Sequence, residues 1–392
     1  MNKIKMKKIY ADNSATSFPK APGVSDAVKD FLDNAGCNVN RGGYESSFNI
    51  ALEILETRKQ LCELFSSNEP RNVIFTPGIT YSLNMILTGF LKDGDHVIAT
   101  AMEHNGVMRP LHELSKKGVS LDIAPCDIDG NLDIDALVKL INSKTKAVVM
   151  THASNVCGTI LPIDNISDVC KKHGIKLIVD SAQTAGILDI NMSHIDALAF
   201  TGHKGLLAAQ GLGGFLVKSD LAERICPIIT GGTGSQSHEI TQPAVLPDKF
   251  ESGTMNIPAI MGLKKALEYI KIVGTRAIFE KEMEYASKFL CAVSAMNDVR
   301  IVGRRDLRGR IAVISLDFIN RDNAEIASIL DRNYGIMVRC GMHCAPIAHK
   351  TLQTYPQGTV RFSFGHFNTP EDIEYTIKSV KEILAGGSRR GF

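Results

Sequence analysis

A lysine and an aspartate each follow a short apolar run of the kind that forms a buried β-strand. The run IKLIVD ends in Asp180, and the run IDALAF leads into TGHK, which ends in Lys204. Because the carboxyl ends of parallel strands meet at one edge of a sheet, we expect both charged groups there. An amine that traps an aldehyde and a carboxylate that keeps a pyridine nitrogen protonated are two groups that pyridoxal 5′-phosphate requires. The pair predicts an enzyme that holds this cofactor as a Schiff base on Lys204 and acts on an amino acid; a solvated turn lysine and a helix-capping aspartate are the alternative.

Polar residues beside this pair favour the same cofactor. Gln183 lies three positions after Asp180, where its amide can donate to the phenolic oxygen of the cofactor. Thr201 and His203 precede Lys204 and can reach the phosphate. The set, rather than any one member, supports the prediction.

A second segment can bind the phosphate. FTPGITYSLNMIL reads as a strand followed by a helix that opens at Gly78, Ile79 and Thr80. Backbone N–H groups at a helix start are free to bind an anion. We therefore expect Ile79 and Thr80 to contact the phosphate, the latter also through its hydroxyl. An ordinary helix entry at the glycine is the alternative.

Three more residues are candidates for contacts with the ring and the substrate. His104 follows the run DHVIAT, where an imidazole can stack on the cofactor ring and move protons. Asn155 follows KAVVMT and can bond the phenolic oxygen and a substrate carboxylate. Arg361 lies in the apolar run TVRFSF, so it should face a planar anion such as an α-carboxylate. A surface histidine and a structural salt bridge of the arginine are the competing interpretations.

The elements that position these residues have an α/β rhythm. Seven runs rich in Val and Ile alternate with helical patterns between Asn72 and Val217: NVIFT, DHVIAT, VSLDIA, KAVVMT, IKLIVD, IDALAF and GGFLV. This order predicts a large domain with a mostly parallel seven-stranded sheet covered by helices on both faces. Upstream, apolar residues at helical spacing predict a packing helix from Glu45 to Phe65: Phe48, Ala51, Leu52, Leu55 and Cys62.

The C-terminal part of the chain has a different pattern. Ile257 to Met296 reads as helical, and the runs VRIVG, RIAVISLDF and TVRFSF then alternate with helices that begin near Asn323 and Pro370. This predicts a smaller α+β domain. We expect an N-terminal arm over 1–20 that packs with the small domain, a large cofactor-binding domain over 21–255, and the small domain over 256–392.

Composition excludes several other classes of protein. The 392 residues carry 44 basic and 42 acidic side chains, so no field of one sign is available to attract nucleic acid. No run of about 18 apolar residues occurs, and we expect no membrane span. The nine cysteines are an odd number in a long chain, which favours reduced thiols and the cytoplasm.

Taken in order, the motifs resemble those of a known family. They are ADNSAT at Ala11, the R-G pair at Arg41, EHN at Glu103, SNVCGT at Ser154, DSAQ at Asp180, TGHK at Thr201, FESGT at Phe250 and RCGMHC at Arg339. The chain resembles, over nearly its whole length, the fold-type I pyridoxal phosphate enzymes of the class V aminotransferase group, specifically the cysteine desulfurases.

The resemblance implies a role for each matching residue. Lys204 would bond the cofactor, Asp180 would hold its ring nitrogen, Gln183 its phenolic oxygen, and His104 would stack on the ring. The residues implied for the phosphate are Thr80, Thr201 and His203. Thr254 matches a threonine that reaches the phosphate of the neighbouring subunit, which implies a homodimer. Asn155 and Arg361 match the substrate-carboxylate clamp, and Arg339 is a further substrate-binding candidate.

Cys344 indicates which reaction of this family to expect. In RCGMHCAPIAH it occupies the position of the desulfurase nucleophile, at the compact spacing of the Suf-like second type. The resemblance implies conversion of L-cysteine to L-alanine, with Lys204 moving the α-proton and sulfur passing to Cys344 as a persulfide. A sulfur-acceptor protein or a thiol would then unload it. The alternatives are a selenocysteine lyase, or another class V aminotransferase, lyase or epimerase acting on a different amino acid.

Some positions depart from the family pattern. Tyr44 stands where many Suf-like enzymes have a histidine, and Ile79 and Tyr81 replace polar residues near the phosphate threonine, so backbone N–H groups should matter more. Cys340 is an extra thiol that can receive sulfur, form a disulfide or simply pack. A zinc site is an alternative use of four residues, although adjacent ligands on one loop suit it poorly and we expect no metal: Cys340, His343, Cys344 and His349.

Overall fold

The computed structural model describes residues 7–39 and 43–386, and its largest sheet has seven strands. In spatial order these are β2 (Val73–Thr76), β8 (Gly213–Val217), β7 (Ala197–Thr201), β6 (Lys176–Asp180), β5 (Thr145–Thr151), β3 (His96–Thr100) and β4 (Ser120–Ala124). Strand β8 is antiparallel to β2 and β7, and the other neighbours are parallel. The predicted α/β fold with a mostly parallel seven-stranded sheet is confirmed.

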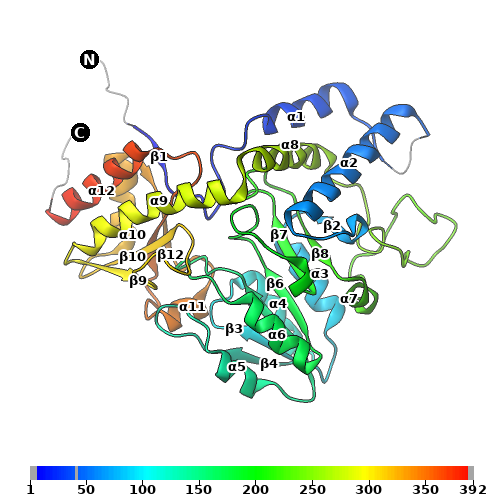
Figure 1. Cartoon of the computed structure of the whole chain (residues 1–392), viewed down its shortest axis with the longest axis horizontal. Helices are drawn as coiled ribbons and strands as arrows, with labels where there is room; N and C mark the ends of the chain where they lie inside the picture. Colours follow the sequence, from blue (N-terminus) through cyan, green and yellow to red (C-terminus); the bar gives the residue numbers. More distant parts are fainter. Residues whose placement is uncertain (1–6, 40–42, 387–392) are drawn as a thin grey trace.

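Helices cover both faces of this sheet because successive strand residues point to opposite sides (Figure 1). In β5, Ala147 and Val149 join one apolar cluster, and Val148 and Met150 join another. The first cluster includes side chains of α3 (Ile79–Phe90), α4 (Asn105–Ser115) and α7 (Ser219–Arg224). The second includes α1 (Val24–Asp30), the π-helical turn Phe31–Ala35, α2 (Glu45–Leu64), α5 (Ile134–Leu140), α6 (Ile163–His173) and α8 (Ile257–Val273).

The helix predicted from Glu45 to Phe65 forms as α2, but its packing face was partly wrong. Cys62 is buried together with Ile54, whereas Phe48 and Leu52 are 62% and 63% exposed. Apolar spacing locates a helix, yet it does not distinguish a face that packs on its own chain from one that faces outward. The exposed face of α2 therefore needs a separate explanation.

The helical stretch predicted from Ile257 to Met296 is two helices, α8 and α9 (Thr275–Ser294), divided at Gly274. That glycine has φ of 87°, a conformation that a side chain disfavours, and its N–H closes α8 on Ile270 O at 2.7 Å. Within the described ranges, every helix is too short or too polar to span a lipid bilayer.

A second sheet lies at the far end of α9 (Figure 1). Its antiparallel strands are β12 (Arg339–Gly341), β13 (Thr359–Ser363), β10 (Val313–Phe318) and β9 (Val299–Val302), and its helices are α10 (Asn323–Tyr334), α11 (Pro346–Thr351) and α12 (Pro370–Leu384). Near the N-terminus, β1 (Ile9–Tyr10) pairs in parallel with β11 (Ile336–Met337). Apart from α11, whose Ala348 belongs to a cluster of the large sheet, these helices and β9, β10 and β13 share an apolar cluster of their own. The domain limits at residues 20 and 255 stay a prediction.

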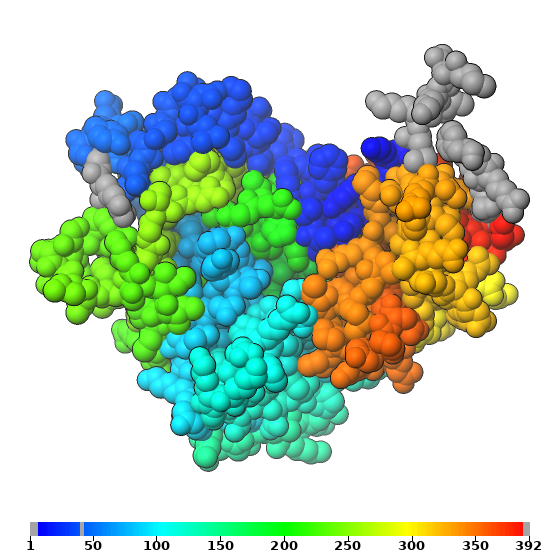
Figure 2. Space-filling view, turned by 180° about the vertical axis from the view of Figure 1, so that it is seen from behind, coloured from blue at the N-terminus to red at the C-terminus, as the bar shows by residue number. Residues whose placement is uncertain are grey.

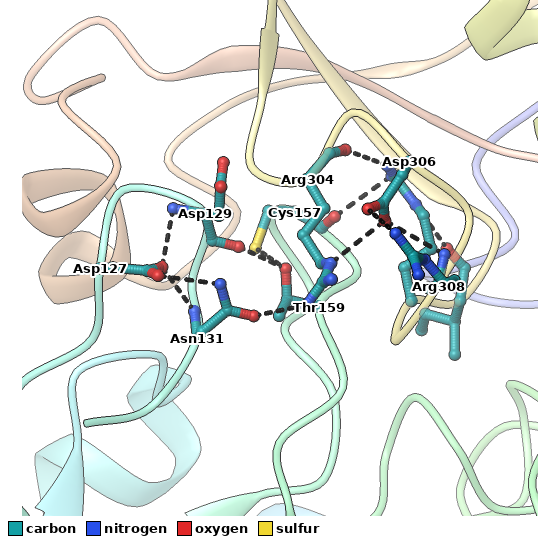
Figure 3. A network of polar contacts seen from close by, with 10 residues as sticks. Asp127, Asp129, Asn131, Cys157, Thr159, Arg304, Asp306 and Arg308 are labelled. Carbon is teal, nitrogen blue, oxygen red and sulfur yellow. Dashed lines mark hydrogen bonds and ion pairs between the residues drawn. The ribbon is translucent and has the colours of Figure 1, made fainter. Parts of the chain in front are cut away.

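Loops from the two sheets meet in a polar network (Figure 3). Arg304, which follows β9, donates through Nη1 to Asn131 Oδ1 at 2.7 Å, and Asn131 donates to Asp127 Oδ2 at 2.9 Å. Thr159 donates to Asp129 O at 2.6 Å. The network joins the smaller sheet to the segment after β5, which carries Asn155.

Candidate active site

Lys204 and Asp180 emerge at the same edge of the large sheet. Asp180 is the last residue of β6, Lys204 comes shortly after the end of β7, and the two strands are parallel neighbours. The Asp180 carboxylate is 4% exposed and accepts a hydrogen bond from Ala182 N–H at 2.8 Å. An amine and an acid thus share one buried edge.

Burial shifts the pKa of both groups toward the uncharged form, and their mutual attraction opposes the shift. Burial lowers the pKa of Lys204 to about 8, with Asp180 opposing this shift and Arg361 and Arg339 adding to it. Burial also raises the pKa of Asp180, against the Ala182 N–H and the charge of Lys204. A large fraction of Lys204 is therefore an uncharged amine near pH 8, the form that attacks an aldehyde or accepts a proton.

His104 caps the N-terminus of α4. Its Nδ1 accepts a hydrogen bond from Gly106 N–H at 2.9 Å. Burial, together with the charges of Lys204 and Arg339, lowers the pKa of His104 to about 4. Because Nδ1 is an acceptor and the ring is uncharged at neutral pH, its single proton lies on Nε2.

Donors for an anion lie at the start of α3 and beside Lys204. Thr80 is exposed, and within the described chain the N–H groups of Ile79 and Thr80 meet no acceptor. His203 Nδ1 is buried and has no hydrogen-bond partner among residues 7–39 and 43–386, which is unfavourable unless a ligand supplies one. Burial lowers the pKa of His203 to about 4, so its ring is neutral. Thr201 is buried at the end of β7, and Gln183 donates to Ser14 O at 3.2 Å.

Arg361 and Asn155 lie together at the junction of the two sheets. Arg361 is 1% exposed; Nη1 donates to Asn155 O at 3.0 Å, and Nη2 pairs with Asp12 Oδ1 at 2.7 Å. The competing interpretation, a structural salt bridge, is thus present. The Arg361 Nε has no partner among the described residues, so part of the guanidinium is available to an anion.

Cys344 lies in a tightly held loop after β12. His343 and Cys344 both have positive φ, 47° and 59°. Asn155 Nδ2 donates to His343 O at 2.8 Å, and Asn105 N–H donates to Cys344 O at 2.7 Å. The loop is therefore held by Asn155, itself a candidate, and by Asn105, which follows the candidate His104.

The Cys344 side chain is exposed, and its sulfur has a cationic neighbour. Arg339 Nη2 donates to Cys344 Sγ at 3.5 Å. Cys344, His104 and Thr80 line one pocket of about 450 Å³. The candidate nucleophile, ring-stacking residue and phosphate ligand thus face a common space.

The four residues of the alternative zinc site do not converge. In the part of the chain that is described, no group of three or more His, Cys, Asp or Glu side chains is placed to hold a metal. His343 bonds Thr359 through Nε2, and His349 bonds Thr354 through Nδ1. Burial lowers the pKa of His343 to about 2.

Cys340 points away from Cys344. Arg339 reaches Cys344, and adjacent residues of a strand face opposite sides, so Cys340 faces the other way. Burial raises the pKa of the Cys340 thiol, and all nine cysteines are free. Of its three possible uses, simple packing matches this placement best.

Two acidic residues with contacts in this region received no role from the sequence. Asp12 pairs with Arg361, and Glu103 is fully buried, accepting from Thr100 Oγ1 and from Thr151 N–H at 2.8 Å. Burial raises the pKa of Glu103 to about 8, so it is mostly protonated at neutral pH. Asp12 lies in the motif ADNSAT and Glu103 in the motif EHN, and only their positions in these motifs could have identified them from the sequence.

Thr254 and Tyr44 lie outside this pocket. Thr254 is exposed and lines a groove with Pro77 and Tyr81 of its own chain. Tyr44 is exposed at the start of α2, and Arg41 lies outside the described residues.

The donor set fits pyridoxal phosphate on chemical grounds. The partly neutral amine of Lys204 suits its aldehyde, and the buried acid Asp180 suits its ring nitrogen. The neutral imidazole of His104 suits the ring face, and His203 and the start of α3 offer polar groups for the phosphate.

Comparison with known proteins gives a consistent result. The family model described as Aminotransferase class-V matches residues 9–376. A probable cysteine desulfurase of Pyrococcus abyssi is 30% identical, with 96% of this chain and 94% of the relative covered. The structure of a cysteine desulfurase from Thermococcus onnurineus superposes with a TM-score of 0.90 at 30% identity, over 97% and 95% of the two chains. For the Escherichia coli cysteine desulfurase CsdA, crystallised in an S-sulfonic acid form, the TM-score is 0.87 at 25% identity, over 97% and 96%.

Proposed function

The chain belongs to the class V aminotransferase family of pyridoxal phosphate enzymes, and from that premise we propose that it is a cysteine desulfurase. The reaction converts L-cysteine to L-alanine, transfers sulfur to Cys344 as a persulfide, and then passes it to an acceptor. The observation that carries the proposal is the exposed Cys344 Sγ, held 3.5 Å from Arg339 in one pocket with His104 and Thr80.

Several residues would hold the cofactor. Lys204 would bond its aldehyde carbon, Asp180 its ring nitrogen, and Gln183 and Asn155 its phenolic oxygen. Its phosphate would be bound by Ile79, Thr80, Thr201 and His203. When bound, pyridoxal phosphate supplies an electron-withdrawing ring next to the α-carbon of the substrate.

The protein's own groups account for binding, proton transfer and sulfur transfer. Arg361, through its free donors, and Asn155 would orient the substrate carboxylate, with Arg339 as a further cation. Lys204 Nζ, partly uncharged near pH 8, accepts the α-proton and later returns it. His104 presents a neutral ring with its proton on Nε2. The Cys344 thiolate attacks the substrate sulfur, so a cysteine and the Cys344 thiol yield alanine and a Cys344 persulfide with no external oxidant.

Brief exposure of the holoenzyme to L-cysteine tests the nucleophile. We expect one added sulfur on Cys344 by mass spectrometry, and we expect Cys344→Ser to lose persulfide and to reduce alanine formation at least about 100-fold, because the catalytic thiol is gone. Cys340→Ser, which removes a thiol on the opposite face of β12, is the matched control and should keep both. Alanine production unchanged in Cys344→Ser would contradict the proposal, and selenocysteine turnover surviving that substitution would favour a selenocysteine lyase.

The enzyme is further proposed to be a cytoplasmic homodimer, with Thr254 reaching the phosphate of the second subunit. Support comes from an exposed apolar stripe along α2, formed by Phe48, Leu52 and Leu55, and from the exposure of Thr254. An apolar stripe of this kind is unfavourable in water and suits an interface. The nine free thiols suit a reducing compartment.

A further inference from the structure

A groove leads away from Cys344 between α3 and α4. Its lining residues recur every fourth position, so they form one stripe on each helix: Thr80, Asn84 and Thr88 on α3, and Arg109, Glu113 and Lys117 along α4 and the turn after it. Cys344 and His104 lie at the end where both helices begin. We name this feature the α3–α4 groove.

The groove lies where two segments that are far apart in the sequence meet. In Figure 2 the surface near residue 100, in cyan, adjoins the surface near residue 340, in orange. The hydrogen bond from Asn105 N–H to Cys344 O joins the same two segments. Cys344, Arg109 and Lys117 are exposed, so an incoming chain can approach Cys344 along α4.

The charge of the groove is positive. Arg109 and Lys117 make no ion pair within the described ranges, whereas Glu113 is paired with Lys116 at 2.7 Å. The α3 wall is uncharged, and Arg339 adds a cation beside the Cys344 sulfur. Two unpaired cations on one wall attract a segment with negative side chains.

The length of the groove limits the size of its occupant. Arg109 to Lys117 spans eight residues along α4 and the turn after it, about 12 Å at 1.5 Å per residue. An extended peptide advances about 3.5 Å per residue, so about four residues fit alongside. An acidic side chain near the thiol would meet Arg109, and one about three residues further would meet Lys117.

We propose that the α3–α4 groove docks an extended, acidic, cysteine-bearing segment of a sulfur-acceptor protein. The inference rests on the proposed function, in which Cys344 carries the sulfur to be unloaded. The thiolate of the segment attacks the terminal sulfur of the Cys344 persulfide. A new S–S bond forms on the acceptor, the bond to Cys344 Sγ breaks with its electrons remaining on that sulfur, and no oxidant or reductant is consumed.

The unloading step is tested with two synthetic hexapeptides, each with one cysteine near its end and either two aspartates or two lysines after it. Holoenzyme loaded with persulfide and freed of excess cysteine is mixed with each peptide, and mass spectrometry follows sulfur on Cys344 and on the peptide. We expect the acidic peptide to unload Cys344 about three- to ten-fold faster at low salt, and the difference to shrink as salt increases.

Variants show whether the groove causes the difference. Arg109→Gln combined with Lys117→Gln should abolish the preference for the acidic peptide while unloading by dithiothreitol stays unchanged. Lys171→Gln combined with Lys172→Gln removes the same charge from α6, on the other face of the sheet, and should leave the preference intact. Equal rates for both peptides in the unmodified enzyme would overturn the inference.

Two further measurements separate this inference from the proposed function and from another occupant. Peptides with serine in place of cysteine, followed by fluorescence anisotropy, report docking even if no persulfide forms; equal binding of acidic and basic peptides overturns the inference alone. Acetylation of Lys117 in the peptide-free enzyme, read by mass spectrometry, should be rapid. Protection of Lys117 without peptide would show that a second copy of the chain fills the groove, and would also overturn it.

Discussion

At the scale of single residues, the chain buries several ionisable groups, and these couple its chemistry to pH. Lys204, His104 and His203 all have pKa values lowered by burial, so each is wholly or partly uncharged where a charge would hinder its proposed role. Burial acts in the opposite direction on acids and favours their protonated form. Glu282 on α9, which lines a small cavity together with Lys204 and Gln183, is such an acid.

Substitution of Glu282 should change how stability depends on pH. Burial raises the pKa of Glu282 to about 8 from an ordinary value of 4.5. Between those values the folded chain holds a proton that the unfolded chain has lost, so the free energy of unfolding falls as pH rises from about 5 to 8, by up to about 4 kcal/mol. Glu282→Gln keeps the shape without the proton and should lose less stability over this window.

Urea unfolding at pH 5, 6, 7 and 8 measures this difference. Glu284→Gln alters an exposed neighbour on the same helix, paired with Lys288, and should follow the unmodified protein. Parallel pH curves for Glu282→Gln and the unmodified protein would show that Glu282 does not titrate as described.

Candidate site residues such as Lys204 and Asp180 could be identified from the sequence because they have reactive side chains and lie at the ends of strands, and strand ends can be located from the sequence. Asp12 and Glu103 were not assigned because their roles depend on contacts with distant segments. Asp12 pairs with Arg361 and Glu103 accepts from Thr151 N–H, and no local pattern encodes either contact. Burial, which determines the pKa of Glu103, is likewise a property of the assembled core.

At the scale of elements, the start of α4 connects two parts of the candidate site. His104 is the N-cap of this helix, and the next residue, Asn105, donates its N–H to Cys344 O. The first residues of a helix leave N–H groups without helical partners, and here one of them holds the nucleophile loop. The orientation of α4 thus determines both the ring of His104 and the position of Cys344.

Replacing Asn105 with proline tests this connection. Proline suits the first position of a helix, and His104 already has φ −74° and ψ 156°, the extended conformation that a following proline requires. Asn105→Pro should therefore leave thermal stability nearly unchanged but remove one hydrogen bond to the Cys344 loop, worth about 0.5–1.5 kcal/mol. We expect persulfide formation to slow about two- to ten-fold with little change in cysteine binding.

Rapid-quench measurement of the Cys344 persulfide gives the rate. Asn105→Ala, which keeps the backbone N–H, is the matched control and should form persulfide at the normal rate. A normal rate in Asn105→Pro as well would show that this hydrogen bond does not position the nucleophile.

Element boundaries were predicted well where local chemistry sets them and less well elsewhere. The starts of α10 and α12 at Asn323 and Pro370 follow capping residues whose side chains accept from the first turn. The division at Gly274 was missed because an isolated glycine in an apolar helical pattern is compatible with a continuous helix. The buried face of α2 was misjudged because periodicity does not reveal what covers it.

At the scale of the whole molecule, the exposed stripe of α2 implies association. Phe48→Glu combined with Leu52→Glu places two charges on this stripe and should shift the proposed homodimer to monomer, because burying unpaired charges is costly. Light scattering coupled to gel filtration gives the mass. Ile272→Glu changes a residue that is 84% exposed on α8 and should leave the mass unchanged.

If the Thr254 assignment is correct, the monomeric variant should also bind pyridoxal phosphate more weakly. Equilibrium dialysis of the cofactor measures this directly. An unchanged mass in the Phe48 and Leu52 variant would show that dimerisation uses another surface, and unchanged cofactor affinity in a proven monomer would remove Thr254 from the phosphate site.

The pairing of β1 with β11 has a consequence for the newly made protein. Ile9 pairs with Ile336, and Asp12 forms an ion pair with Arg361. Strand β1 therefore cannot pair until the last quarter of the chain has been synthesised. The residues of the large sheet, 73–217, leave the ribosome well before that and can assemble first. The strand that precedes Lys204 can therefore form before Arg361, the arginine proposed to bind the substrate, has been synthesised. On this order of events, the residues around Lys204 are available to pyridoxal phosphate earlier than the substrate-binding residues are available to the amino acid.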